Sequence, residues 1–161
     1  MIIFDLDDTL YKESTYVDSG LKAVAADAEE AGVMPASDAY AMIKSAPDVA
    51  SGFDRLAAIA LESETYELFD IQRMLAVYRY HIPEISLPSD SRKILDHLKE
   101  AQVNMGMITD GRSQTQRAKI LALGLDAYFP ADNILISEEV GSDKQLFGRR
   151  AFREKRDVQI G

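Results

Sequence analysis

Three carboxylates follow a short apolar segment at the start of the sequence. Residues 2–4 (Ile-Ile-Phe) lead into Asp5, Asp7 and Asp8. Carboxylates a few ångström apart raise one another's pKa unless a cation or hydrogen bonds intervene. The spacing therefore predicts a divalent-metal site, or a nucleophilic acid beside a second acid that carries protons. An ordinary acidic turn at the exit of a strand is the alternative.

A hydroxyl and two main-chain amides come after a second apolar segment. Residues 103–108 are followed by Thr109, Asp110 and Gly111, and a helix is expected next. Amides that enter a helix beside a hydroxyl form a cradle for anions. Arg112 could hold a second anionic group, although a surface arginine at a helix start is an equal alternative. The segment predicts an anion site, while Thr-Asp-Gly is also a common turn.

Alternating strands and helices are expected to position these groups. Strand patterns at residues 2–4, 103–108, 133–136 and 158–160 alternate with helical patterns at 89–102, 113–123 and 144–155. This alternation predicts an α/β fold with a doubly wound parallel sheet. Ligands bind beyond the carboxyl ends of the strands in such sheets. We therefore expect Asp5, Asp7 and Thr109 to lie at one edge of the sheet.

The residue patterns also predict which parts of these elements are buried. The uninterrupted apolar run at residues 2–4 predicts a strand that is buried on both faces. Ser89 is expected to cap the helix that begins there, because its hydroxyl can accept a main-chain hydrogen bond. The helical period places three apolar residues on the buried face of that helix: Ile94, Leu95 and Leu98.

An all-helical insertion separates the two apolar segments. Helical patterns occur at residues 16–32, 37–46, 48–61 and 64–80, and no strand pattern is found between residues 11 and 87. Gly32 is expected to end the first of these helices. Six aromatic and methionine side chains are expected to form the insertion's own core rather than a binding pocket: Tyr40, Met42, Phe53, Phe69, Met74 and Tyr78.

Composition restricts the classes of function. The chain has 161 residues, 47% hydrophobic and 28% charged, which suits one soluble domain or a core domain with a small insertion. A net charge of −9 argues against nucleic acid and anionic membranes as partners. The absence of cysteine and of an apolar run of roughly 20 residues predicts a cytoplasmic protein without disulfides or a membrane span. His81 and His97 are too far apart for a zinc site.

The first motif resembles a family signature. An apolar strand followed by D-x-D-x-T-L looks like the first motif of the haloacid dehalogenase superfamily, whose members are mostly Mg²⁺-dependent phosphatases. The resemblance implies that Asp5 is the nucleophile and a Mg²⁺ ligand. It implies that Asp7 is the general acid and base, with its main-chain carbonyl as a second metal ligand. Members that cleave carbon–halogen bonds usually lack an acid at the Asp7 position, so phosphoryl transfer is favoured.

Two further motifs of this superfamily have counterparts in the sequence. Thr109, with the amides of Asp110 and Gly111, resembles the second motif and would bind the phosphate. Lys144 resembles the third motif, because Ser-Glu-Glu-Val-Gly at residues 137–141 matches the superfamily's usual lead-in. This lysine would neutralise the charge of the phosphate and the nucleophile. The following Gln-Leu-Phe-Gly differs from the common Pro-x-Pro, which leaves the shape of this loop open.

The fourth motif of the superfamily has no counterpart in the sequence. Members carry a pair of acids just after the fourth strand, and one of them completes the Mg²⁺ site. Here residues 157–161 (Asp-Val-Gln-Ile-Gly) supply the strand and the glycine. We therefore expect the sequence to be part of a longer protein, and Mg²⁺ binding by the 161 residues to be weakened. Three other acids could substitute as ligands: Asp132, Glu138 and Asp143.

The resemblance also implies a division into two domains. Residues 1–13 and 88–161 would form a Rossmann-like core that carries the site, and residues 14–87 would form a helical cap. Residues 11–13 would form a mobile flap that gates the site. A cap of this kind implies a small, soluble phosphate ester as the substrate, reached by opening and closing.

The predicted function is Mg²⁺-dependent hydrolysis of such a phosphate monoester through an aspartyl-phosphate on Asp5. A catalytically silent or truncated member that acts as a binding module is one alternative. A phosphomutase or dehalogenase of the same superfamily is another. A response-regulator receiver also combines an acidic cluster, a threonine and a lysine, but the long helical insertion between Asp7 and Thr109 disfavours it.

Overall fold

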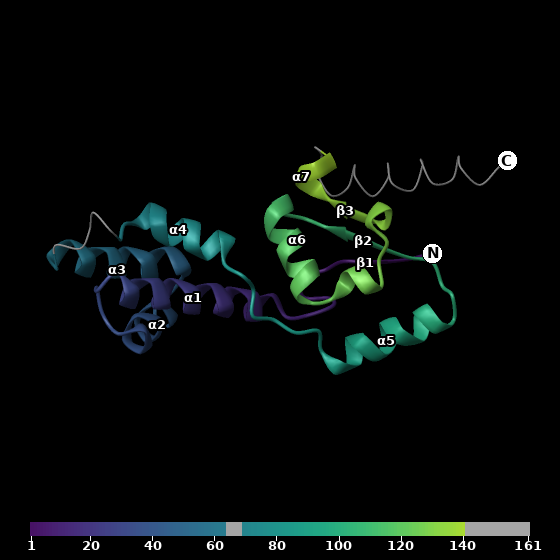
Figure 1. Ribbon diagram of the computed structural model, residues 1–161, viewed down its shortest axis with the longest axis horizontal. Helices are drawn as coiled ribbons and strands as arrows, with labels where there is room; N and C mark the ends of the chain where they lie inside the picture. The colour runs from purple at the N-terminus through teal and green to yellow at the C-terminus, as the bar shows by residue number, and fades with distance from the viewer. Residues whose placement is uncertain (64–68, 141–161) are drawn as a thin grey trace. The chain divides into compact units, whose positions relative to one another are not determined.

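The computed structural model describes residues 1–63 and 69–140 (Figure 1). These residues fold into two compact units. One unit consists of Met1–Glu13 and the described residues from Ile85 onward, and the other is Ser14–Glu84.

Four predicted features lie outside the described residues: the helix at 144–155, the strand at 158–160, the possible ligand Asp143, and Lys144. Within the described ranges, no helix combines the length and the apolar character that a membrane crossing requires.

The first unit contains a parallel sheet. Its three strands are β1 (Ile2–Phe4), β2 (Met105–Thr109) and β3 (Ile134–Ile136), in the order β1-β2-β3. Phe4 lies opposite Met107, and Thr109 lies opposite Ile136. The carboxyl ends of the three strands therefore meet at one edge. The predicted α/β class, with a parallel sheet and an inserted run of helices, is confirmed.

Strand β1 is less buried than its apolar sequence predicts. Ile2 is 39% exposed, and the next two residues are half-buried. Among the described residues β1 pairs only with β2, whereas β2 has a strand on each side. Met107 and Thr109 of β2 are accordingly buried. The expectation that residues 2–4 are buried on both faces is therefore wrong for the described part of the chain.

Short helical elements flank the strands of this unit. The α-helices are α5 (Ser89–Glu100), α6 (Ser113–Ala122) and α7 (Ser137–Val140), and two 3-10 turns span Leu125–Ala127 and Ala131–Asn133. Two expectations for α5 are wrong in detail. Pro88, rather than Ser89, occupies the N-cap position, and no side chain caps the helix. Ile94 is 55% exposed, so the buried stripe of α5 consists of Leu95 with the half-buried Leu98.

The second unit is built from helices. They are α1 (Glu13–Glu30), α2 (Ala36–Lys44), α3 (Val49–Glu62) and α4 (Ile71–Tyr80). The Asp48 and Asp70 carboxylates cap α3 and α4 by accepting hydrogen bonds, each 2.7 Å long, from main-chain amides three residues later. The cap at Asp70 explains why the helix predicted at residues 64–80 begins only at Ile71 in the described part of that segment.

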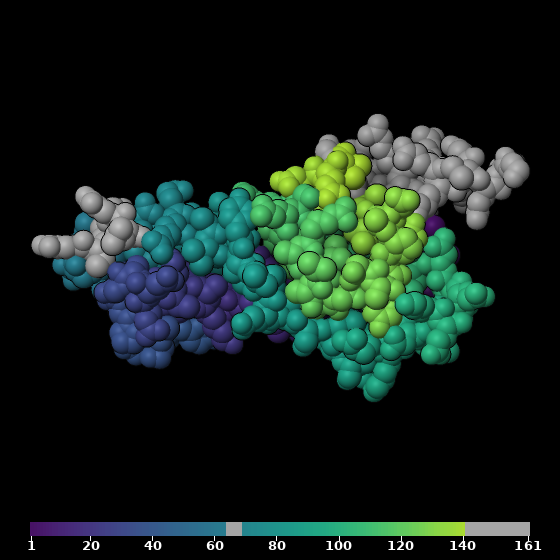
Figure 2. All heavy atoms as spheres, viewed as in Figure 1, coloured from purple at the N-terminus to yellow at the C-terminus, as the bar shows by residue number. Residues whose placement is uncertain are grey.

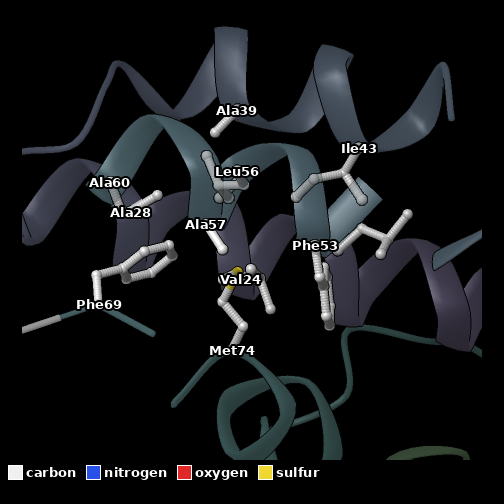
Figure 3. Close-up of a cluster of buried hydrophobic side chains, with 12 residues drawn as sticks. Val24, Ala28, Ala39, Ile43, Phe53, Leu56, Ala57, Ala60, Phe69 and Met74 are labelled. Atoms are coloured by element: carbon white, nitrogen blue, oxygen red, sulfur yellow. The ribbon is translucent and has the colours of Figure 1, made fainter. Parts of the chain in front are cut away.

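The helices of the second unit share a core, in which side chains from the packed helices point toward one another (Figure 3). Phe53, Phe69 and Met74 are at most 1% exposed, as the sequence predicts. Tyr40 and Tyr78 pack part-buried against this cluster, whereas Met42 is not a member of it. The other buried members are small or aliphatic: Leu21, Val24, Ala25, Ala28, Ala39, Ile43, Leu56, Ala57 and Ala60.

The close approach of α2 and α3 at Gly52 gives a testable prediction. A Cβ atom at Gly52 would lie 2.8 Å from the Ile43 Cγ2 atom and 3.0 Å from the Ile43 Cα atom. Gly52→Ala should therefore lower the free energy of unfolding by about 1–3 kcal/mol, although alanine is the better helix former. Urea unfolding followed by circular dichroism measures this change.

Ala58→Gly is the matched control, because Ala58 lies on the exposed side of the same helix. This variant should lose about 1 kcal/mol from helix propensity alone. Stabilisation by Gly52→Ala would contradict the close packing of α2 against α3.

Candidate active site

Asp7 lies after β1 and is held by donors from three residues. The Tyr11 hydroxyl donates to Oδ1 at 2.7 Å, and the Lys119 ammonium donates to the same oxygen at 2.8 Å. The Gln116 amide nitrogen donates to Oδ2 at 2.9 Å. These four side chains are called the Asp7 network below. Lys119 is 3% exposed and lies 3.8 Å from a Glu13 carboxylate oxygen, so a buried ammonium beside two partly exposed carboxylates anchors the network.

The protonation of Asp7 reflects two opposing effects. Burial alone would raise the pKa of the Asp7 carboxyl group, because its charged form loses solvation. Hydrogen bonds from Lys119, Gln116 and Tyr11 outweigh burial, so the pKa lies below the ordinary value of 3.8. Asp7 is therefore ionised at neutral pH. The stability that this lowered pKa contributes is present above the unfolded-state value and is lost as the pH falls through the folded-state pKa.

Thr109 ends β2 and is brought close to Asp7. Its side chain is fully buried, and its Oγ1 atom accepts a hydrogen bond from the Gln116 amide nitrogen at 2.6 Å. The same nitrogen donates to Asp7, so one amide spans the two predicted site residues. The parallel pairing of β1 with β2 is what makes this span possible, because both strands end at the same edge.

Asp5 and Asp8 differ in their surroundings. Asp5 is half-buried, and its Oδ1 atom accepts a hydrogen bond from the Leu6 amide at 3.0 Å. Asp8 has a φ of +54°, and its carboxylate accepts a hydrogen bond from the Glu13 amide, the first residue of α1, at 3.1 Å. Aspartate tolerates this left-handed conformation better than most residues. Asp8 therefore stabilises the turn that leads into α1 by accepting this hydrogen bond.

The loop from Asp110 to Arg112 is tied to the segment after β3. The Gly111 amide donates to the Ser137 hydroxyl at 3.0 Å, and that hydroxyl donates to an Asp110 carboxylate oxygen at 2.5 Å. The Ser113 amide, at the start of α6, donates to Glu138 at 2.7 Å. Arg112 occupies the N-cap position of α6 and is exposed. The Gly111 amide of the expected anion cradle, and the Ser113 amide beyond it, are thus bonded to protein groups.

The donors near Asp5 suit one class of metal. Mg²⁺ is usually bound by one or two carboxylates together with waters and substrate phosphates. The Asp5 carboxylate and the Asp7 main-chain carbonyl are oxygen donors of this type, whereas the Asp7 carboxylate is engaged within the Asp7 network. Among residues 1–63 and 69–140, no group of three or more His, Cys, Asp or Glu side chains could hold a metal ion. The Asp5 carboxylate and the Asp7 carbonyl are thus donors of the kind that an open Mg²⁺ site uses.

Sequence reasoning misses the three residues that contact the Asp7 carboxylate. Gln116 and Lys119 lie on the face of α6 that also carries the buried Ile120. Two polar residues on an otherwise apolar helix face are the pattern that could have indicated them. Tyr11 belongs to the segment predicted as a flap, yet it is 3% exposed and bonded to Asp7.

A second polar cluster lies in the helical unit. The Asp18 carboxylate accepts hydrogen bonds from Lys44 and Tyr40, each at 2.5 Å, and pairs with Lys22 at 3.0 Å. The Lys44 ammonium, followed by the Tyr40 hydroxyl and Lys22, holds the pKa of Asp18 well below its usual range. Asp18, Lys22 and Lys44 line an open cavity of about 410 Å³. Both lysines are therefore paired with a carboxylate of the cavity itself.

Comparison with known families gives one match over most of the chain. A family model described as haloacid dehalogenase-like hydrolase matches residues 1–154. A solved structure of a haloacid dehalogenase-like family hydrolase from Xanthomonas campestris is 23% identical, with a TM-score of 0.45. The match covers 84% of this chain and 60% of that one.

Three relatives are similar in sequence. The chain is 25% identical, over 99% of its length, to glyceraldehyde 3-phosphate phosphatase of Methanothermobacter thermautotrophicus. It is 29% identical, over 89% of its length, to the protein of the same name from Methanocaldococcus jannaschii. It is 28% identical, over 89% of its length, to ribulose-1,5-bisphosphate 5-phosphatase of Halopiger xanaduensis. The aligned regions span 75%, 64% and 65% of the lengths of these relatives.

The Asp7 network predicts a measurable change in protonation. Lys119→Met removes the buried cation and keeps an unbranched side chain, so the pKa of Asp7 should rise from its lowered value. Carbon-13 NMR of the Asp7 carboxyl group during a pH titration measures it. Lys93→Met, which removes the exposed partner of Asp90, is the matched control and should leave the pKa of Asp7 unchanged. An unchanged pKa in Lys119→Met would contradict the ion pair.

Proposed function

The chain belongs to the haloacid dehalogenase-like hydrolases, and from this membership we propose that it is a phosphatase acting on a small phosphorylated sugar. The three relatives described above are named as phosphatases of a triose phosphate or of a pentose bisphosphate. The observation that supports the proposal most is the single amide that spans Asp7 and Thr109. These residues would serve as the acid and as a phosphate-binding hydroxyl, and Asp5, two residues before Asp7, is the candidate nucleophile.

In the first proposed step, Asp5 attacks the phosphorus atom of the ester. A bond forms between the Asp5 carboxylate oxygen and phosphorus, and the bond from phosphorus to the sugar oxygen breaks. The leaving oxygen takes a proton from Asp7, which yields the free sugar and an aspartyl-phosphate. The negative charge of the bound phosphate raises the pKa of Asp7, so that Asp7 can carry this proton.

In the second proposed step, water attacks the phosphorus atom of the aspartyl-phosphate. The Asp7 carboxylate takes a proton from the water, and the bond between phosphorus and the Asp5 oxygen breaks. Inorganic phosphate is released and the Asp5 carboxylate is restored. Because Asp7 is ionised in the described structure, with three side chains holding its oxygens, it is suited to the role of base.

Several other residues have proposed roles in binding the phosphate. The Thr109 hydroxyl and the Asp110 amide would donate to phosphate oxygens, and the Gly111 amide would do so only after its release from Ser137. Lys144 would neutralise charge on the phosphate and the nucleophile, and Arg112 would hold a second anionic group. Mg²⁺, held by the Asp5 carboxylate and the Asp7 main-chain carbonyl, would neutralise charge on the phosphate.

The helical unit has a proposed role as well. We propose that residues 14–87 serve as a cap that admits the substrate and excludes water during the reaction. A cytoplasmic location also remains a prediction from the composition.

A binding module without turnover is the second candidate function. It is favoured by one observation, namely that among the described residues no three or more His, Cys, Asp or Glu side chains are grouped so that they could hold a metal ion. Such a module would bind a phosphate ester without releasing inorganic phosphate.

The proposed function predicts that turnover depends on Asp5. Phosphate release from glyceraldehyde 3-phosphate and ribulose 1,5-bisphosphate should require Mg²⁺ and should fall at least about 10³-fold in Asp5→Asn, because an amide is a poor nucleophile. A phosphate adduct on Asp5, trapped by acid quench and located by mass spectrometry, would identify the intermediate.

Asp8→Asn is the matched control for this test. It makes the same chemical change three residues away, and asparagine can keep both the left-handed conformation and the cap on α1. This variant should retain activity within a few-fold. Turnover that persists in Asp5→Asn would disprove the role of Asp5, and ester binding without phosphate release would favour the binding module.

A further inference from the structure

Gln116 connects three groups of the candidate site through one amide. Its Nε2 atom lies 2.9 Å from Asp7 Oδ2, 2.6 Å from Thr109 Oγ1 and 2.8 Å from the Asp110 carbonyl oxygen. The residue is 1% exposed, and its amide nitrogen shares two hydrogens among the three acceptors. One glutamine thus joins the segment after β1 to the end of β2 and to the loop that follows.

The orientation of this amide follows from its partners. Carboxylate and carbonyl oxygens can only accept hydrogen bonds, so Nε2 rather than Oε1 must face Asp7 and Asp110. The Gln116 Oε1 atom is buried and has no hydrogen-bond partner among the residues that the structure describes. An unpaired buried oxygen is unfavourable for stability. This indicates that the three hydrogen bonds of Nε2, rather than any contact of Oε1, determine the orientation of the Gln116 side chain.

Gln116 also determines how the Thr109 hydroxyl can be used. The Thr109 oxygen accepts a hydrogen bond from Nε2, so its own hydrogen can only be donated to a different acceptor. A phosphate oxygen of the substrate would be such an acceptor in the proposed reaction. The glutamine therefore orients the threonine as a donor.

The loop after β2 is fitted closely around the same side chain. Gly111 has a φ of +140°, and a Cβ atom there would lie 3.3 Å from the Gln116 Cδ and Nε2 atoms. Lys119, about one helical turn beyond Gln116, holds the other carboxylate oxygen of Asp7. One buried face of α6 therefore holds both oxygens of Asp7, while other residues of α6 are exposed on the surface drawn in green in Figure 2.

We propose that Gln116 is a positioning residue for the phosphatase reaction. It holds the Asp7 carboxylate, the Thr109 hydroxyl and the Asp110 loop in one arrangement before the substrate arrives. The proton donor and the phosphate donor are then in place when the ester bond breaks, and no energy is spent on ordering them. The inference rests on the proposed function, because it assigns Asp7 the role of acid.

The leaving group of the substrate gives a direct test. An alkyl ester such as glyceraldehyde 3-phosphate needs a proton from Asp7, whereas p-nitrophenyl phosphate releases a stable phenolate without one. Gln116→Met in the full chain should lower kcat/KM about 10²-fold for the alkyl ester. For the aryl ester the loss in kcat/KM should be only about tenfold. The part of the alkyl-ester loss that exceeds the aryl-ester loss should lie in kcat.

A double variant with Asp7→Asn distinguishes a positioning role of Gln116 from a general role in stabilising the fold. In Asp7→Asn, where the acid is already removed, adding Gln116→Met should lower kcat/KM for the alkyl ester only about tenfold further, the part that reflects weaker phosphate binding, rather than about 10²-fold. Gln114→Met is the matched control, because it makes the same change at an exposed position of α6 and should leave both esters unaffected. Gln116→Asn keeps the amide on a shorter side chain, and should give an intermediate loss if Gln116→Met fails to fold.

Binding of inorganic phosphate, measured by calorimetry, distinguishes failure of this inference from failure of the proposed function. If the chain binds phosphate but turns over neither ester, the phosphatase proposal fails. The positioning role then still requires about tenfold weaker phosphate binding in Gln116→Met and unchanged binding in Gln114→Met. Equal losses on both esters, additive losses in the Asp7→Asn background, or unchanged phosphate affinity would overturn the inference. A chain that neither binds nor hydrolyses would contradict both proposals.

Discussion

The candidate site depends on one constraint, namely that a carboxylate and an ammonium can be buried only if they are buried together. Lys119 is buried and Asp7 is partly buried, with 2.8 Å between their charged groups and 112 positions between them in the sequence numbering. Either group alone would lose solvation without compensation. Their pairing therefore fixes α6 against the segment after β1, and Gln116 and Tyr11 supply the remaining hydrogen bonds that a buried pair needs.

The parallel sheet makes this pairing possible. β1 and β2 run in the same direction, so Asp7 and Thr109 emerge at the same edge although the helical unit separates them in the sequence. The helix that follows β2 then begins beside both residues, and its first buried turns reach back to them. A short connection from β2 to α6 leaves little freedom in where Gln116 lies. The backbone topology thus determines which helix face meets the carboxylate.

The sequence predicts the framework of this arrangement better than its contacts. The apolar segments that end at Asp5 and Thr109 identify two strands of the sheet, and Gly32 adopts the positive φ typical of a helix end. These features are local and depend on residue type. The start of α4 could not be predicted from local residue types. The helical pattern begins at residue 64, whereas α4 begins at Ile71, after the cap at Asp70. The exposure of Ile94 depends on which residues pack against α5. The periodicity of apolar residues in the sequence gives no information about these neighbours.

The partners of Asp7 were hidden for a different reason. A glutamine and a lysine on a helix are ordinarily solvated, and only the tertiary fold shows that their face is the buried one. Motif reading finds groups that react, since those follow strands at recognisable spacings. It does not find the groups that hold them, because these lie on another element and have no fixed spacing from the motif.

The start of α6 shows how an anion site can be prepared without a ligand. The Ser113 amide is bonded to Glu138, and the Gly111 amide is bonded to Ser137. The positive end of α6 is therefore already neutralised in part by a carboxylate of the protein. A phosphate at this edge would rely first on the Thr109 hydroxyl and on cations, because it must otherwise displace protein groups from the amides. Both amides are thus paired with groups of the protein. This pairing makes the alignment of Thr109 by Gln116 matter more than the dipole of the helix.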